Sequence, residues 1–378
     1  MKICHVITRM ILGGAQENTL LTCERLHARG HDVTLVTGPA RGPEGQLMDR
    51  VRAGGYRVAV LDSLRREIHP LRDWRVEREL EELLADLAPD VVHTHSSKAG
   101  ILARRAAARV GGAKVVHTIH GLPFHPHERW WLNRLYILLE RRAAANTDAY
   151  ISVADAMTTQ MQAAGVGLGK PFVTIYSGME TATFLSRPAG ADGFRRQLGL
   201  SDQAVLVTQV SRLAPLKGHE YLLAAAAQVR DPNVRFCFVG DGAWRERIAR
   251  DIHARRLDAR VHLTGLLPPE QMPAVMHATD ILVHCSLREG LARTLPQAML
   301  AGRPVVSFDI DGAREVVNDR TGVLLPPKDT PGLVRAIETL ASDPARRAAL
   351  GQAGRESCRH RFDHEHMADG IEDVYRGL

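Results

Sequence analysis

The fold is decided by a stretch in the last third of the chain, Ile281–Phe308, which reads ILVHCSLREGLARTLPQAMLAGRPVVSF. Its first four residues predict a short buried strand, the middle predicts a helix, and Pro304–Phe308 predicts the next strand. A strand, a helix and a second strand in this order form one right-handed crossover of a parallel sheet. The same unit is therefore expected elsewhere in the chain.

Short β-branched runs recur along the whole chain with helical stretches between them. The expected strands are Lys2–Ile7, Asp32–Thr37, Tyr56–Leu61, Val91–Thr94, Lys114–Thr118, Ala149–Val153, Phe172–Tyr176, Val205–Val210, Val234–Val239, Val261–Thr264, Ile281–His284 and Pro304–Phe308. The pattern pauses at Ser186–Gly193 (SRPAGADG), a Pro- and Gly-rich stretch that predicts a linker. The sequence therefore predicts two doubly wound α/β domains, residues 1–185 and 186–361.

Composition supports two folded domains and narrows the partners. The chain has 378 residues, of which 45% are hydrophobic and 24% charged, which is ordinary for a globular protein of about two domains. A net charge of +6 favours anionic partners such as phosphorylated small molecules or anionic lipid. The sequence shows no basic run interleaved with aromatic residues, so we expect no nucleic-acid binding.

Cysteine usage and hydropathy predict a cytoplasmic protein. The five cysteines are scattered and form no C-x-x-C pair, which predicts neither a disulfide framework nor a zinc site. No apolar run reaches the roughly 18 residues of a membrane span, and the N-terminal apolar stretch is too short for a signal peptide.

The loops after the strands of the second domain carry the candidate chemistry, because ligands of doubly wound sheets bind beyond the carboxyl ends of the strands. Arg212 and Lys217 lie between a strand and the helix beginning near His219, where two cations and a helix N-terminus suit a diphosphate. A solvated turn with two surface charges is the alternative. Gly240 and Gly242 follow the next strand, where a tight turn lets backbone approach a ligand; a plain turn is the alternative.

Glu289 and Gln297 form the most specific pattern. Glu289 stands beside Gly290 at the end of a strand, where its carboxylate can accept hydrogen bonds from sugar hydroxyls. Gln297 follows about two helical turns further on and is expected on the same side.

This region resembles the E-x7-E segment of the family-4 retaining glycosyltransferases of the GT-B fold, including the strand A-G-x-P-V-V that follows it. The resemblance implies two Rossmann-like domains facing across a cleft, with a C-terminal helix (362–378) that crosses back to the first domain. It places Arg212 and Lys217 on the donor's diphosphate and Glu289 on the transferred sugar. Here the second acidic position is Gln297, so the pattern is E-x7-Q, which implies weaker or altered ribose recognition.

The first domain resembles bacterial surface-polysaccharide members of the same family in three places. Gly13-Gly14 opens a helix after the first strand, His93–Gly100 (HTHSSKAG) follows the fourth, and His117–Pro123 (HTIHGLP) follows the fifth. By resemblance, His120 lines the cleft close to the donor sugar. From the residues alone, His93 and His95 are packed histidines, acceptor contacts or metal ligands, and we favour the first two because no carboxylate completes a coordination set.

The resemblance implies a full set of site residues. The catalytic set is Glu289, His120, Arg212 and Lys217; the donor-binding set is Gly14, Arg212, Lys217, Gly240, Gly242, Glu289, Gly290, Leu291, Ala292 and Gln297; the acceptor-side set is Gly13, His95, Ser96 and Lys98. No metal is expected, since the two cations would stabilise the leaving diphosphate.

The helix expected over Glu128–Arg142 (ERWWLNRLYILLERR) places Trp131, Leu135 and Leu138 on one face. Basic and aromatic residues on an amphipathic helix suit a membrane surface, and docking on the protein's own sheet is the alternative. The first alternative predicts peripheral association at the inner face of the membrane.

The expected activity is transfer of a sugar, with retention, from a nucleoside-diphosphate sugar to a saccharide or lipid-linked acceptor, without a cofactor. A UDP-sugar is the favoured donor. Two alternatives stay open: a nucleotide-sugar epimerase of the same architecture and a non-catalytic nucleotide-sugar-binding protein.

Overall fold

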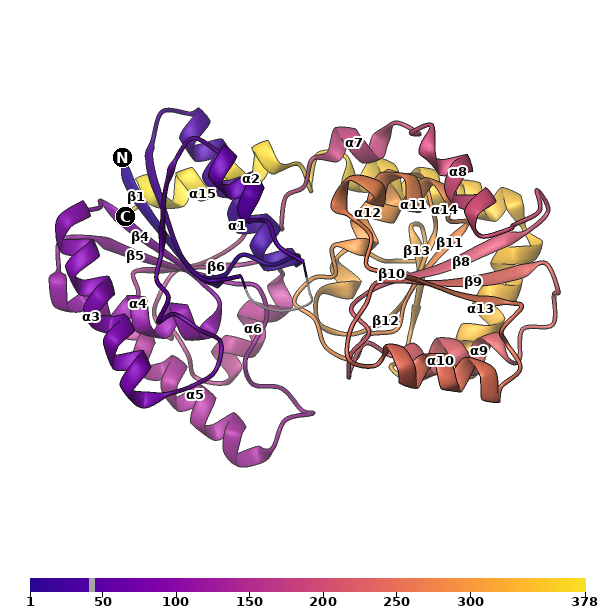
Figure 1. Cartoon of the computed structure of the whole chain (residues 1–378), viewed down its shortest axis with the longest axis horizontal. Helices are drawn as coiled ribbons and strands as arrows, with labels where there is room; N and C mark the ends of the chain where they lie inside the picture. The colour runs from indigo at the N-terminus through magenta and orange to yellow at the C-terminus, as the bar shows by residue number, and fades with distance from the viewer. Residues whose placement is uncertain (41–44) are drawn as a thin grey trace. The chain divides into compact units, whose positions relative to one another are not determined.

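The computed structural model of the chain describes residues 1–40 and 45–378. The chain divides into two compact units: unit 1 comprises Met1–Met179 and Asp363–Leu378, and unit 2 comprises Glu180–Phe362. Each unit is built around one parallel sheet (Figure 1). The chain thus passes from one unit to the other at 179/180 and 362/363, whereas the sequence-based division stood at 185/186 and 361/362. Helix α7 (Thr181–Leu185) accounts for the first difference, because it packs on helices of unit 2.

Unit 1 holds a seven-stranded sheet in the order β3-β2-β1-β4-β5-β6-β7. Its strands are β1 (Lys2–Arg9), β2 (Asp32–Gly38), β3 (Arg57–Val60), β4 (Val91–His95), β5 (Lys114–Ile119), β6 (Ala149–Ser152) and β7 (Phe172–Thr174). Its helices are α1 (Gly14–Ala28), α2 (Met48–Ala53), α3 (Pro70–Leu87), α4 (Ser97–Val110), α5 (Trp130–Ala144), α6 (Asp155–Ala163) and α15 (His364–Arg376).

Helices cover both faces of the unit 1 sheet. Odd-numbered β1 residues such as Ile3 and Ile7 pack with α1, α2 and α15, while even-numbered ones such as Cys4 and Val6 pack with α3 and α4, as the two-residue side-chain period of a strand requires. Helix α15 lies beside α1 (Figure 1). Arg29 of the α1 C-terminus ties the two helices together through ion pairs with several carboxylates of α15.

Unit 2 holds a six-stranded sheet in the order β10-β9-β8-β11-β12-β13. Its strands are β8 (Val205–Val210), β9 (Val234–Val239), β10 (Val261–Gly265), β11 (Ile281–His284), β12 (Val305–Phe308) and β13 (Gly322–Leu325). Besides α7, its helices are α8 (Gly190–Gln197), α9 (His219–Ala226), α10 (Arg245–Ala254), α11 (Met272–Ala278), α12 (Thr294–Leu300), α13 (Thr330–Ser342) and α14 (Pro344–Cys358), with short 3-10 turns η1 (Pro269–Gln271) and η2 (Asp311–Glu315).

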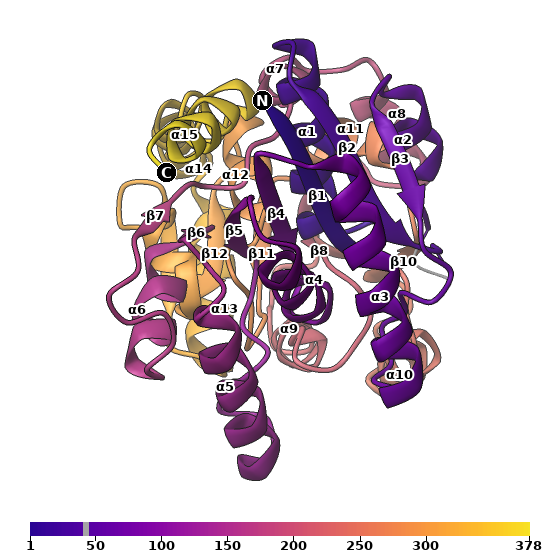
Figure 2. The same ribbon diagram turned by 90° about the vertical axis from the view of Figure 1, so that its left-hand side faces the viewer.

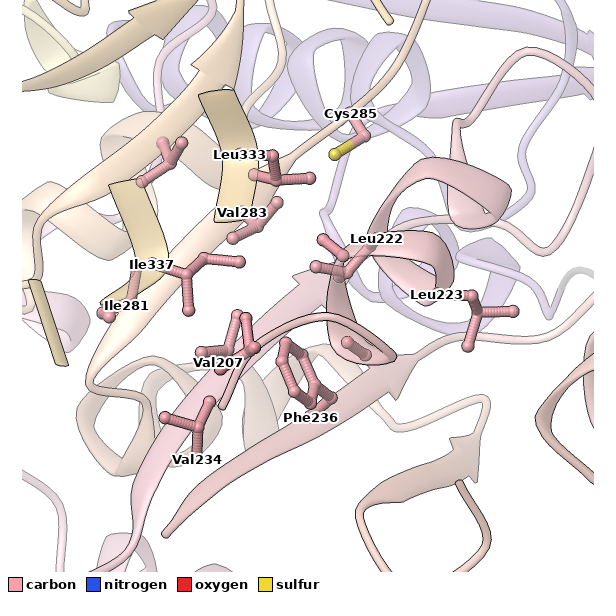
Figure 3. Packing of buried hydrophobic residues seen from close by; sticks show 14 of the residues in the cluster. Val207, Leu222, Leu223, Val234, Phe236, Ile281, Val283, Cys285, Leu333 and Ile337 are labelled. Atoms are coloured by element: carbon pink, nitrogen blue, oxygen red, sulfur yellow. The ribbon is translucent and has the colours of Figure 1, made fainter. Parts of the chain in front are cut away.

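The larger core of unit 2 lies between its sheet and helices α9, α10 and α13. Figure 3 shows Val207, Phe236 and Ile281 of three strands meeting Leu222 of α9 and Ile337 of α13. A smaller cluster on the opposite face joins Phe194 of α8 to α11. The strands predicted from the sequence are all present, and β13 is an additional edge strand that the sequence reading missed.

The expected linker is wrong for its second half. Gly190–Gly193 open α8, whose Ala191 and Phe194 are buried, and Arg187 donates a hydrogen bond to the carbonyl of His277 in unit 2. Burial against α11 therefore outweighs the low helix propensity of two glycines. In the part of the chain that the structure describes, no helix combines the length and the apolar character that crossing a membrane requires.

Candidate active site

The switch point of the unit 2 sheet lies between β8 and β11, because the strand order runs outward in opposite directions from this pair. In doubly wound sheets the loops beyond such a pair separate and leave a crevice for ligands. The loop after β8 and the loop after β11 are joined here by a hydrogen bond from the Leu287 N–H to the Leu216 carbonyl, at 2.8 Å. These two loops carry Arg212, Lys217 and Glu289.

The carboxylate of Glu289 lies among polar groups of these two loops. Its Oε1 forms an ion pair with the ammonium of Lys217 and accepts a hydrogen bond from the Ser286 hydroxyl at 2.9 Å. His284, the last residue of β11, places Nε2 at 3.4 Å from the same oxygen. Both members of the ion pair keep some contact with solvent, since 26% of the Lys217 side chain and 22% of the Glu289 side chain are exposed.

Glu289 is ionised in this setting. Burial by itself would raise the pKa of its carboxyl, but the charge of Lys217 and the hydrogen bond from His284 outweigh it and hold that pKa far below its usual range. The Glu289 N–H donates to Oδ2 of Asp311 at 2.8 Å, so the loop after β12 fixes the backbone of this residue. The site therefore presents a fixed carboxylate beside a fixed ammonium.

Gly218 brings Lys217 to the end of β11. Its φ is +72°, and a Cβ at this position would stand 1.9 Å from the Cys285 carbonyl oxygen. Only glycine fits such an approach. The adjacent His219, whose pKa is lowered to about 4 by burial and by Lys217, shares a hydrogen bond with the Ser211 hydroxyl at 3.1 Å.

Gly240 and Gly242 must be glycine because of close contacts within unit 2. A Cβ would stand 2.1 Å from the Ser211 carbonyl oxygen at Gly240 and 2.5 Å from that of Leu213 at Gly242. The loop after β9 thus packs on the backbone of the loop that carries Arg212. These glycines support the site by letting the two loops meet.

The remaining donor-side residues lie in the same two loops and in α12. Arg212 is exposed in the loop after β8, and Gly290 accepts a hydrogen bond from Gly312. Leu291 and Ala292 belong to the loop ahead of α12. Gln297 is the fourth residue of α12 and only 9% exposed. The expectation that Gln297 lies two helical turns beyond Glu289 is wrong, because α12 begins at Thr294.

Three polar residues of this site were not singled out from the sequence: His284, Ser286 and Asp311. The signal that could have found them is the one used for Arg212, since each stands at the end of a strand or in the loop that follows. Asp311 also has a φ of +45°, a strained backbone of the kind that concentrates at functional sites.

The switch point of unit 1 lies between β1 and β4 and holds histidines. His5 of β1 stands opposite His93 of β4 in the strand register, and His95 ends β4. His5 Nδ1 lies 3.0 Å from His95 Nε2, and His95 Nδ1 lies 3.0 Å from Nε2 of His120, which follows β5. His5, His95 and His120 therefore form a hydrogen-bonded chain that ends at a half-buried residue.

His93 is held separately. Its Nδ1 bonds the Tyr375 hydroxyl of α15 and its Nε2 bonds the Thr118 hydroxyl at 2.6 Å. Burial lowers the pKa of His5 to about 3 and those of His93 and His95 well below the usual value, so this group is neutral at pH 7.

Nitrogens of His5, His93 and His95 come within 4.8 Å of one another, as the metal-ligand alternative requires. Protein hydrogen bonds already engage both ring nitrogens of His93 and of His95. A metal would have to displace them, so packing by hydrogen bonds accounts for the cluster as it stands. Complete burial also leaves no surface of His95 for direct contact with an acceptor.

The other acceptor-side residues lie nearby. Gly13 precedes α1, which Gly14 begins. Ser96 has a φ of +64° and shares a hydrogen bond with the Thr8 hydroxyl at 2.8 Å. Lys98 forms an ion pair with Asp73 of α3 at 2.6 Å.

The fully buried residues of helix α5 all lie toward its C-terminal end. Glu140 forms a buried ion pair with Arg104 of α4 at 2.7 Å, and Ala143 and Ala144 are buried. The large apolar side chains Trp130, Trp131, Leu135 and Leu138 are 68%, 48%, 41% and 44% exposed. Docking of this face on the sheet is therefore wrong as an account of the helix, which runs away from the unit 1 sheet in Figure 2.

Comparison with known proteins agrees with this geometry along nearly the whole chain. Residues 12–183 match the family model described as Glycosyltransferase Family 4, and residues 191–357 match the one described as Glycosyl transferases group 1. Among curated relatives, the UDP-Gal:alpha-D-GlcNAc-diphosphoundecaprenol alpha-1,3-galactosyltransferase of Escherichia coli is 28% identical over 99% of this chain and 96% of its own length. The GDP-mannose-dependent alpha-(1-6)-phosphatidylinositol monomannoside mannosyltransferase of Mycolicibacterium smegmatis is also 28% identical, over 86% of this chain and 85% of its own.

A solved structure shows the same fold. Anabaena Alr3699/HepE, crystallised in complex with UDP, superposes with a TM-score of 0.83 over the full length of both chains at 23% identity. The two sheets with interleaved helices are those of GT-B enzymes. With both halves matched and curated enzymes aligned over most of their length, the chain belongs to the family-4 glycosyltransferases of the GT-B fold.

Proposed function

We propose that this glycosyltransferase moves a hexose, with retention of anomeric configuration, from a UDP-sugar to a saccharide or lipid-linked acceptor. The observation that carries the proposal is the Lys217–Glu289 pair at the switch point of unit 2. A cation and a carboxylate side by side match the two parts of a nucleotide sugar, its diphosphate and its hydroxyl-bearing ring. Unit 2 is then the donor unit and unit 1 the acceptor unit.

Lys217 serves both parts of the donor. Its ammonium has three N–H donors, so it can keep Glu289 and still bind a phosphate oxygen. Arg212, exposed in the same loop, adds a planar fork suited to phosphate. These two charges stabilise the departing UDP, which is the role a divalent metal plays in other transferases, and we expect activity to persist in EDTA.

Glu289 acts as a hydrogen-bond acceptor for the sugar. Its lowered pKa and its bonds to Lys217 and Ser286 make it a poor nucleophile, because those interactions stabilise the carboxylate itself. The retaining route is therefore front-face attack, with a phosphate oxygen of the departing UDP taking the acceptor proton. His120 of unit 1 contacts the transferred sugar, and Gly13 and Ser96 contribute to the acceptor side.

The donor assignment rests on two supports. The fold neighbour was crystallised with UDP, and the E. coli relative uses UDP-Gal. The mycobacterial relative uses GDP-mannose, so the base must be tested directly. Gln297, which replaces a carboxylate, is expected to bind the ribose by neutral hydrogen bonds.

One experiment tests the activity and its stereochemistry. Thermal shift with UDP, GDP and ADP selects the nucleotide, since a ligand at 100 times its Kd stabilises by about 2.7 kcal/mol. The matching nucleotide sugars are then incubated with and without diphosphoundecaprenol-linked and free saccharide acceptors. We expect an α-linked product from an α-linked donor by NMR, in the presence of EDTA. A β-linked product overturns retention, and an epimerised donor without acceptor identifies an epimerase instead.

Of the two acceptor classes, a free saccharide and a lipid-linked saccharide, binding of α5 to a membrane would favour the lipid-linked one. Its exposed face carries Trp131, Leu135 and Leu138, and exposed arginines stand among them. Arg134 lies over the Trp130 ring at 5.1 Å. Apolar anchors among cations suit an anionic lipid surface, where an undecaprenyl-linked acceptor resides.

Vesicle flotation tests this surface. The wild type is expected to float with anionic vesicles, and a double variant, Trp130→Ser with Trp131→Ser, is expected to remain in the dense fraction. Trp74→Ser is the matched control, because Trp74 is a 60% exposed tryptophan on α3 of the same unit. Flotation that is unchanged in the double variant, or equally reduced in the control, contradicts a membrane role for α5.

A further inference from the structure

The chain of histidines in unit 1 has a direction that can be worked out from its buried end. His5 is completely buried, and its Nε2 has no hydrogen-bond partner. Each neutral imidazole carries one proton, so every ring in the chain donates through one nitrogen and accepts through the other. The protons of His5, His95 and His120 are therefore linked, and only two arrangements of them are consistent with both hydrogen bonds.

In the first arrangement His5 Nδ1–H donates to His95 Nε2, and His95 Nδ1–H donates to His120 Nε2. The orphan His5 Nε2 is then a bare lone pair. In the second arrangement both bonds run the other way, and His5 Nε2 carries an N–H in a site without an acceptor. Among buried backbone groups an N–H without a partner is rarer than an under-satisfied acceptor, and an unpaired His5 N–H likewise forfeits the donor's hydrogen bond to water. The first arrangement is favoured.

We propose that His5 and His95 are positioning residues that fix the tautomer of His120, so that His120 accepts a bond at Nε2 and carries its proton at Nδ1. This inference rests on the proposed function, in which His120 contacts the transferred sugar. A proton at Nδ1 makes that atom a hydrogen-bond donor toward a sugar oxygen. His120 then stabilises negative charge on oxygen and does not remove a proton through that atom.

The surroundings keep His5 and His95 neutral. The His5 ring lies 5.0 Å from that of His93 and 5.4 Å from that of His95, centroid to centroid. Burial is the largest cause of the lowered pKa values of these rings, and the neighbouring histidines lower those of His93 and His95 further. A neutral chain has a defined tautomer, whereas a protonated ring would donate from both nitrogens and lose the direction.

Two substitutions of His95 separate its two bonds. In Asn the amide lies near the place of the ring Nδ1, so His95→Asn keeps a donor for His120 and loses the bond to His5. In Gln the amide lies near the place of Nε2, so His95→Gln keeps the bond to His5 and loses the one to His120. His117→Asn is the control. His117 is equally buried on β5 but faces the other side of the sheet, where its Nδ1 bonds the Thr94 hydroxyl at 2.8 Å.

Nitrogen NMR of 15N-histidine-labelled full-length protein reads the tautomer without any assay. We expect Nδ1–H for His120 in the wild type, in His95→Asn and in His117→Asn, and loss of that form in His95→Gln. The kcat for sugar transfer should fall about 10-fold to 100-fold in His95→Gln, as on loss of an orienting partner, with the donor KM unchanged. It should stay close to the wild-type value in His95→Asn, because the orienting bond to His120 is kept.

The wild-type spectrum decides the matter even if a variant fails to fold. A His120 proton on Nε2, or equal spectra and kcat in His95→Asn and His95→Gln, overturns the proposal. If no sugar transfer is found with any acceptor, the proposed function fails, while the tautomer of His120 is still read and judged separately.

Discussion

The two switch points of this enzyme stand at equivalent places of two similar sheets and differ in charge. Between β8 and β11, Lys217 and Glu289 form an ion pair that keeps contact with solvent. Between β1 and β4, His5 and His95 are fully buried and neutral. Charges are stable at the switch point of unit 2 because each ion there has a partner and some contact with water. An ion at the switch point of unit 1 would be desolvated. The difference suits the diphosphate donor that we propose for unit 2 and the uncharged acceptor hydroxyl that we propose for unit 1.

The largest effect should come from removing the cation of unit 2. In Lys217→Ala the proposed diphosphate site loses an ammonium, and Glu289 loses its counter-ion. We expect kcat/KM to fall about 1,000-fold, comparable to deleting one preorganised donor to a developing anion. Steady-state kinetics with the nucleotide sugar measure the loss of turnover, and calorimetry with the free nucleotide measures the loss of binding.

Arg250→Ala is the control for that prediction, because Arg250 is an exposed cation of α10 in the same unit. It should retain wild-type kinetics. Turnover in Lys217→Ala within a few-fold of wild type would contradict the assignment of Lys217 to the donor site. The charge difference between the two switch points would then have no functional meaning.

A smaller loss should follow from disturbing the backbone that positions Lys217. Gly218→Ala combines a φ of +72° with a Cβ only 1.9 Å from the Cys285 carbonyl oxygen. Gly199 has nearly the same backbone, with a φ of +63°, but nothing lies within 4 Å of its Cβ. Gly199→Ala should therefore cost only the left-handed conformation, about 1 kcal/mol.

Gly218→Ala should cost about 3 kcal/mol in the free energy of unfolding, in the range of overpacking, and should lower nucleotide affinity as well. Urea unfolding of both variants, followed by nucleotide titration, makes the comparison. Equal stability of the two would show that the loop after β8 can move away from β11, so that Gly218 is not needed to place Lys217.

The strands of both sheets were predicted well from the sequence, whereas the polar partners of the site residues were predicted poorly. Strands such as Val205–Val210 and Ile281–His284 match the structure at both ends, because buried parallel strands are continuous β-branched runs. The edge strand β13 was missed, since its four residues are followed by two prolines and read as a loop. Helix α8 was missed because two glycines stand in its first turn and Pro188 comes just before it. Its packing on α11 is a tertiary effect.

The candidate site divides in the same way. Arg212, Lys217 and Glu289 follow strands and belong to a family pattern, so the sequence was enough to select them. The partner Asp311, which follows β12, and the order of the histidine chain depend on which strands are neighbours. His5 and His95 are 90 residues apart and meet at 3.0 Å only because β1 pairs with β4. Local patterns carry no record of that pairing.

The smallest effect per residue should come from lowering the pH, and it should differ between the two units. His5 has a pKa of about 3 in the folded chain, and those of His93, His95 and His117 are also well below 6.5. The unfolded chain therefore binds protons below pH 6.5 that folded unit 1 does not, and stability falls as the pH is lowered from that value. At pH 5.5 each such histidine costs about 1 kcal/mol.

Unit 2 responds less in this window. The pKa of Glu289 is lowered, so the stability it contributes is present above its unfolded value of 4.5 and is lost only below it. The lowered pKa values of His219, His262 and His277 weaken unit 2 as well, but these residues are fewer and only His219 has a large shift, to about 4. Hydrogen exchange at pH 7 and 5.5, corrected for intrinsic rates, should show β1, β4 and β5 losing more protection than β8 and β11. His95→Asn should reduce the loss of protection in unit 1 by the contribution of about one histidine. Equal losses of protection in both units would mean that the histidines of unit 1 take up protons while folded. A chain with a fixed tautomer cannot do so.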